Sequence, residues 1–355
     1  MQFADVLERP QNNLNLIRLI AALMVTFSHA YILTGNLHNE PFLRWTGDQT
    51  AGYLGVFVFF VVSGVLVTRS YARTESIVHY VGSRALRIYP ALAMVLLLSA
   101  IPMGLWWTQL SFGEYLQRPE VWRYVTDNLY FNTNHQLPGV FEKLVGERSV
   151  NGSLWTLGHE VYAYFLVIVF GLLGLLRNPT AFNVTVAGLV LLYLKQPVGF
   201  LLAPAKWEAP ILVPLLGFLF GAFVYVNRAH LHCRLRYLVL AAIAYLTCRH
   251  GIWNVPVVVL SVGYAVLALG FHPHLQLRLN IRNDYSYGIY LYSFPIQQTV
   301  VWLLPGLQPW QHFALALLFI IPLSALSWHG LEQPTLKLKK FLPKSQPDAQ
   351  RKPTV

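Results

Sequence analysis

Long apolar runs, separated by short polar segments, recur along the whole chain. Each run has about 16 to 23 residues, close to the roughly 20 that an α-helix needs to cross the hydrocarbon core of a bilayer. The pattern predicts an all-α integral membrane protein of about ten transmembrane helices. The predicted spans are residues 15–34, 51–69, 88–107, 154–176, 180–195, 209–227, 235–249, 252–271, 284–304 and 310–330.

Composition and charge agree with a membrane protein. The 355 residues are 55% hydrophobic, with a mean hydropathy of +0.47, far above an ordinary soluble domain. Most of the 26 Lys and Arg residues fall in segments on one side of the predicted spans, so the positive-inside rule predicts that both termini are cytoplasmic. Topology thereby explains the net charge of +11. We predict a multi-pass protein of the inner or plasma membrane, surrounded by lipid, with no nucleic-acid partner.

The first apolar run contains two side chains that are costly in lipid, Arg18 and His29. They are eleven residues apart, which on an α-helix is close to a whole number of turns and a rise of about 16 Å. Taken singly, Arg18 fits a side chain that extends to the cytoplasmic interface, and His29 fits a hydrogen-bonded packing residue. Their common face favours a shared polar passage.

Four arginines lie in the predicted cytoplasmic segment between the second and third spans. Arg69 and Arg73 are four residues apart, and Arg84 and Arg87 are three apart, so each pair projects from one helical face. Guanidinium groups present planar forks of donors to phosphate oxygens. The cluster is therefore a candidate phosphate site. Plain anchoring at the membrane surface is the alternative, preferred for Arg69 and Arg73 but not for Arg84 and Arg87.

Glu160 enters the fourth span within the segment NGSLWTLGHEVYAY, at a depth that matches His29. We expect the two to pair, because a carboxylate bonded to an imidazole raises its basicity, as a general base requires. A purely structural Glu160 that ties helices together is the alternative. Ser63, next to Gly64 in the second span, is interpreted first as a small residue for close helix packing and second as a lining residue of the passage.

Two segments lie outside the helical pattern. Residues 108–151 form a long outer loop, and the aromatic and charged residues of 111–131 are typical of a helix at a membrane surface. This loop either caps the bundle or helps to bind an acceptor. Residues 336–355 are predicted as a basic, disordered cytoplasmic tail that follows a membrane domain of residues 1–335. The sequence has no P-loop or dinucleotide-binding glycine pattern, which argues against a nucleotide-hydrolysing transporter.

Five of these stretches, in this order, resemble membrane-bound acyltransferase family 3, which includes bacterial enzymes that O-acetylate surface polysaccharides and nodulation factors. The resemblance covers nearly the whole chain. It rests on Arg18 with His29 after ten intervening residues, GVFVFFVVSGVL from Gly55, RALRIYP from Arg84, SLWTLGHE ending at Glu160, and SYGIYLYSFPI from Ser286.

The resemblance implies that an acyl-CoA, commonly acetyl-CoA, binds from the cytoplasm and that its acyl group passes to a hydroxyl of a glycan or lipid-linked sugar on the outer side. No metal is expected. The family's first-helix Arg and His correspond to Arg18 and His29, its Arg-x-x-Arg to Arg84 and Arg87, and its Ser-Leu-Trp acid to Glu160. The predicted catalytic residues are His29, Glu160 and Arg18, and the predicted donor-binding residues are Arg84, Arg87, Arg69, Arg73 and Ser63.

Two roles remain open for His29: it deprotonates the sugar hydroxyl for direct attack on the thioester, or it carries the acyl group itself as an acyl-imidazole. Arg18 either stabilises the thioester end of the donor or holds CoA phosphate, and a donor-binding role is preferred. Many family members have a histidine where this chain has Ser293, so no role is carried over for it. An appended hydrolase-like domain is not expected, which leaves acceptor handling to the membrane domain or to a partner protein.

The competing hypothesis is a proton-coupled secondary transporter or flippase that uses Arg18, His29 and Glu160 as a relay. Intramembrane charges permit this function. The lack of an internal repeat and the presence of a cytoplasmic Arg-x-x-Arg argue against it.

Overall fold

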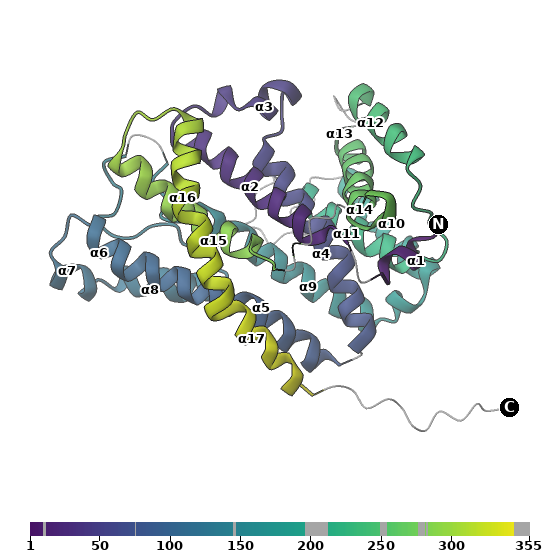
Figure 1. Ribbon diagram of the computed structural model, residues 1–355. Helices are drawn as coiled ribbons and strands as arrows, with labels where there is room; N and C mark the ends of the chain where they lie inside the picture. Colours follow the sequence, from purple (N-terminus) through teal and green to yellow (C-terminus); the bar gives the residue numbers. More distant parts are fainter. Residues whose placement is uncertain are drawn as a thin grey trace.

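The protein is a bundle of helices, seen here in a computed structural model that describes residues 1–9, 12–74, 76–144, 147–195, 212–248, 254–275, 281 and 283–343 (Figure 1). In this part of the chain the only β-type pairing is an isolated bridge between Gln2 and His232. The all-α prediction is therefore confirmed.

Each predicted span coincides with a helix or a run of joined helices. Within the part of the chain that the structure describes, five helical segments are long and apolar enough to cross a membrane: Leu14–Leu33, Ala51–Thr74, Ile77–Trp107, Gly152–Leu172 and Pro309–Phe341. The number of ten spans and the orientation of the termini stay predictions. The spans correspond, in order, to α2 (Leu14–Leu33), α4 (Ala51–Thr74), α5 (Ile77–Leu98) continued by α6 (Gly104–Trp107), α9 (Trp155–Leu172), α10 (Pro179–Lys195), α11 (Leu212–Val226), α12 (Arg236–Cys248), α13 (Asn254–Val257) continued by α14 (Gly263–Phe271), α15 (Ser286–Leu303) and α16 (Pro309–Ser327).

Helix α5 begins at Ile77, well before the predicted start of the third span at residue 88. The side chain of Ser76 caps it by accepting a hydrogen bond from the backbone N–H of His79 at 3.2 Å. An apolar run marks only the part of a helix that suits lipid, whereas the backbone hydrogen bonds continue through the charged turns before it. Arg84 and Arg87 consequently lie within a helix, as their predicted common helical face requires.

Helix α4 lies at the centre of the bundle and packs most extensively against α11 and α2 (Figure 1). Glycine permits the close approach: a Cβ on Gly64 would collide with the backbone oxygen of Phe218, and one on Gly221 would collide with that of Val61. Small residues at helix crossings let backbones approach in this way. The expected packing role of the Ser63–Gly64 pair is borne out at Gly64.

We expect Gly64→Ala to destabilise the protein by about 1–3 kcal/mol, because the added methyl group must push α4 and α11 apart. Thermal unfolding of the purified protein in nanodiscs measures the effect. Gly188→Ala in α10 is the matched control, since a Cβ there meets no atom within 4 Å. Equal unfolding temperatures for the two variants would contradict the close packing described above.

The long outer segment contains two helices, α7 (Phe112–Gln117) and α8 (Pro119–Leu129), and α8 packs along α5. The hydroxyl of Tyr115 donates to the backbone oxygen of Ala100 at 2.8 Å. Further along, the amide of Gln298 in α15 donates to the backbone oxygens of Glu147 at 2.8 Å and Ser149 at 2.7 Å. The segment is therefore fixed to the bundle at both ends.

The last helical segment continues beyond residue 335, where the sequence places the start of a disordered tail. It passes through α17 (Gln333–Lys337) and a further turn, Leu338–Phe341, and both pack beside α5 (Figure 1). The side chain of Leu342 occupies the space next to Gly82, and the Ser76 hydroxyl donates to the backbone oxygen of Pro343 at 3.3 Å. The remainder of the predicted tail, residues 344–355, lies outside the described residues.

Candidate active site

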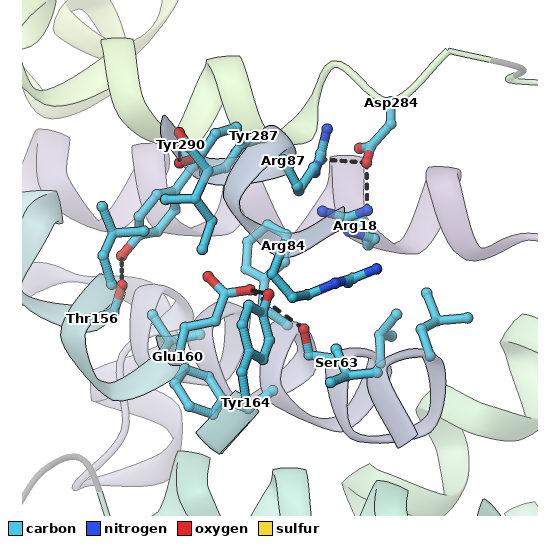
Figure 2. A pocket seen from close by; sticks show the side chains of 18 of the residues that line it. Arg18, Ser63, Arg84, Arg87, Thr156, Glu160, Tyr164, Asp284, Tyr287 and Tyr290 are labelled. Atoms are coloured by element: carbon cyan, nitrogen blue, oxygen red, sulfur yellow. Dashed lines mark hydrogen bonds and ion pairs between the residues drawn. The ribbon is translucent and has the colours of Figure 1, made fainter. Parts of the chain in front are cut away.

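A cavity of about 280 Å³ lies between α2, α4, α5, α9, α15 and the C-terminal helical segment. Its polar lining comes from residues that are far apart in the sequence (Figure 2). The sequence named Arg18, Ser63, Arg84, Arg87 and Glu160 as site residues, and all five line this one cavity. Aromatic and aliphatic side chains form most of the remaining wall, among them Phe59, Phe60, Leu66 and Trp328.

Arg18 and Arg87 share one carboxylate, that of Asp284, immediately before α15. Arg18 pairs with Oδ2 of Asp284, and Arg87 donates to the same oxygen at 2.6 Å (Figure 2). Arg87 also reaches Glu332 at 3.3 Å and lies over the ring of Tyr287, 5.0 Å from its centroid. Because buried charges are stable only when paired, this network holds α2, α5, α15 and the C-terminal segment in register.

Arg84 differs from Arg87, its partner in the Arg-x-x-Arg motif. Among the described residues it makes no ion pair, and its buried Nε has no hydrogen-bond partner. The guanidinium lies over the ring of Tyr164, 5.7 Å from the centroid, and faces the cavity (Figure 2). A cation that faces a cavity and has no counter-ion among the described residues is suited to bind an anionic ligand.

Glu160 is held on the cavity wall by neighbours from two helices. It accepts a hydrogen bond from the Tyr164 hydroxyl, one turn along α9, and one from Ser63 of α4 at 3.5 Å (Figure 2). Ser63 thus takes the lining role that the sequence offered as its second interpretation. Among the described residues, no hydrogen bond joins Glu160 to His29.

His29 does not line the cavity. Its ring packs edge-on against Phe294, with 5.0 Å between centroids, and its buried Nδ1 has no hydrogen-bond partner in the described part of the chain. The prediction that Glu160 pairs with His29 is therefore not reproduced by the geometry of the described residues.

The cavity ends at Tyr290, one turn of α15 before Phe294. The Tyr290 hydroxyl bonds to Thr156 at 2.6 Å and donates to the backbone oxygen of Ser153 at 2.9 Å, which links α15 to the start of α9 (Figure 2). Since α15 rises about 1.5 Å per residue, Phe294 and the imidazole on it lie about 6 Å past this end.

Comparison with known proteins places the chain in a family. The acyltransferase domain model of family 3 matches residues 11–329. The chain belongs to acyltransferase family 3. An O-acetyl transferase of Shigella phage Sf6 is 32% identical over 341 residues, covering 93% of this chain and 96% of that protein. Nodulation protein 10 of Rhizobium leguminosarum bv. viciae is 28% identical over 383 aligned positions, covering 94% and 95%. No solved structure matches.

In this family 3 acyltransferase, Arg69 and Arg73 lie away from the cavity. Both pair with the carboxylate of Glu8, which follows α1 (Phe3–Leu7), Arg69 at 3.3 Å. Arg73 and Glu8 are half exposed, at 52% and 50% of their side-chain surface. The geometry favours the anchoring interpretation for this pair over donor binding.

Asp284 and Glu332 are two carboxylates at the site of this acyltransferase that sequence reasoning missed. Each stands at the edge of an apolar run, in a chain with only 15 Asp and Glu residues. An arginine inside a span needs a buried counter-ion, so the scarce acids that flank apolar runs are the signal that would have found them. The two side chains are 11% and 2% exposed.

Proposed function

We propose that the protein transfers an acyl group, most simply acetyl, from cytoplasmic acyl-CoA to a hydroxyl of a cell-surface glycan or lipid-linked sugar on the outer side. Family membership supports acyl transfer, and the relative described as an O-acetyl transferase supports acetyl and an oxygen acceptor. The observation that carries the proposal is the cationic cavity whose lining starts at Arg84 and ends at Tyr290, about one helical turn short of His29.

The size and charge of the cavity fit one part of an acyl-CoA. At about 280 Å³ it is slightly smaller than the roughly 300–1,000 Å³ of pockets for drug-sized ligands. It accommodates an extended pantetheine arm, while the bulkier nucleotide stays at the entrance. Arg84 is the arginine available to bind the phosphates of CoA. The positive charges of Arg87 and Arg18 are already compensated by the carboxylates of Asp284 and Glu332.

Transfer of the acyl group requires a general base or nucleophile near the thioester, at the far end of the pantetheine arm. In direct transfer, the His29 imidazole takes the proton of the acceptor hydroxyl, the oxygen attacks the thioester carbonyl, the C–S bond breaks, and the thiolate of CoA takes up a proton. In the stepwise alternative, an imidazole nitrogen attacks the thioester carbonyl, the C–S bond breaks and CoA leaves as the thiolate. The acceptor hydroxyl then attacks the acyl-imidazole, the C–N bond breaks, and the hydroxyl proton neutralises the thiolate. Nδ1 of His29 has no hydrogen-bond partner among the described residues, which is consistent with either role.

The decisive experiment follows acetyl-CoA in the purified protein, reconstituted in nanodiscs with candidate surface-glycan acceptors. We expect acceptor-dependent release of CoA and an acetylated glycan that mass spectrometry identifies. If no acyl-CoA and no acceptor gives turnover, while the protein supports proton-dependent solute uptake, the transporter hypothesis replaces this one.

The same assay tests the role of the unpaired arginine. Arg84→Gln should raise KM for acetyl-CoA about tenfold with a small change in kcat, because it removes a charge-assisted bond made equally in the ground state and the transition state. Arg73→Gln, a half-exposed arginine outside the cavity, is the matched control and should leave KM unchanged. Equal KM values for the two variants would exclude Arg84 from donor binding.

A further inference from the structure

Lys339 is the cation of the cavity that neither the Arg-x-x-Arg motif nor the span pattern identifies. It belongs to the turn Leu338–Phe341, which packs beside α5, and it lines the cavity together with Arg84 and Arg87. Its neighbours Lys337 and Lys340 are exposed, whereas Lys339 is half-buried. Lys339 therefore differs from these two lysines in its burial and in its position on the cavity wall.

The turn that carries Lys339 is fixed on α5. Leu342 fills the space above Gly82, and Pro343 accepts a hydrogen bond from Ser76 at the first turn of that helix. Lys339 lies between Glu332, which pairs with Arg87, and Leu342, which packs on Gly82, so it stands beside the turn of α5 that carries Arg84 and Arg87. The entrance is accordingly assigned to this end of the cavity, opposite Tyr290.

Charges at the entrance are unbalanced. Four cations line the cavity, Arg18, Arg84, Arg87 and Lys339, together with the two carboxylates Glu160 and Asp284, and Glu332 behind Arg87 adds a third carboxylate. Within the described residues, neither Lys339 nor Arg84 has an ion pair, and Arg84 and Arg87 lie near enough for their charges to act on Lys339. Holding like charges together at a partly buried site costs free energy, which an anion bound between them offsets.

We propose that Lys339 and Arg84 together form a phosphate-binding clamp at the entrance, in which the C-terminal turn supplies half of the site for the phosphorylated end of the acyl donor. The inference rests on the proposed function and adds to it a binding residue from a segment that the sequence assigned to a disordered tail. The ammonium of Lys339 provides a point charge, and the guanidinium of Arg84 provides directed donors.

The test is CoA binding to the purified, full-length protein in phosphatidylcholine nanodiscs, measured by isothermal titration calorimetry. We expect Lys339→Gln to weaken CoA binding about tenfold, in line with the loss of one charge-assisted bond. Lys339→Arg should bind within about twofold of wild type, because it keeps the charge. Lys337→Gln is the matched control: it removes the same charge from an exposed position of the same segment and should also stay within about twofold.

The outcomes separate this inference from the proposed function. If wild type does not bind CoA, the acyl-CoA donor itself is wrong. If wild type binds CoA and Lys339→Gln binds as tightly as Lys337→Gln, the donor stands and the clamp is wrong, as it would be if Lys339 only contacted lipid headgroups at the membrane surface. An arginine variant as weak as the glutamine variant would also overturn a charge-based role.

Discussion

Replacing His29 with glutamine is expected to lower the rate of acetyl transfer by about 10²–10⁴-fold, the usual contribution of a positioned acid–base group. The substitution keeps a polar side chain of similar length against Phe294 but removes the group that accepts the proton or the acyl unit. CoA binding should be unchanged, because His29 lies outside the cavity that Arg84 and Lys339 line. The measurement is CoA release with acceptor, together with calorimetric binding of CoA.

His159→Gln is the matched control for this prediction. His159 is also a buried histidine of a span-forming helix and directly precedes Glu160, but it is not among the cavity-lining residues. It should keep most of the wild-type rate. Comparable losses in both variants would point to general damage from removing a buried imidazole, and would remove His29 from the reaction.

Asp284→Asn should produce the largest loss of stability, about 3–5 kcal/mol, because it leaves Arg18 and Arg87 buried without their shared counter-ion. The two arginines are only 22% and 13% exposed and come from different helices, so solvent compensates the lost carboxylate only in part. Thermal unfolding in nanodiscs measures the loss.

Glu8→Gln provides a closely matched comparison, because Glu8 also joins two arginines, Arg69 and Arg73. Its carboxylate is half exposed, so solvent screens both pairs and the expected change in stability is small. If the two variants unfold at the same temperature, burial does not distinguish the two clusters and the structural role assigned to Asp284 is incorrect.

The sequence alone predicted most of the helices and five of the residues that line the cavity. It could do so because the length of an apolar run and the helical periodicity of polar residues are local properties of the chain. It could not decide whether Glu160 contacts His29. Depth along two helices was estimated from their ends, but contact also depends on how each helix is rotated about its axis, which only packing decides. Glu160 accordingly turns toward Tyr164 and Ser63, while the ring of His29 packs against Phe294.

The basic C-terminal run shows a second limit. Composition predicts disorder where lysines and prolines gather, but it does not register a single apolar contact such as Leu342 on Gly82. That contact fixes the turn in which Lys339 faces the cavity and Lys337 does not. Lys337 and Lys339 carry the same charge in the same basic run. Only their places on the helical turns decide that Lys339 lines the cavity and that Lys337 is exposed.

The hydrogen bonds of Tyr290 to Thr156 and Ser153 also have a consequence for the ion permeability of the membrane. A water-filled passage lined by cations, open to both surfaces, would conduct small anions and dissipate any ion gradient across the bilayer. Tyr290 ties α15 to α9 where the cavity ends, and Phe294 packs one turn further along. We therefore expect these two side chains to keep the charged cavity from conducting chloride across the bilayer.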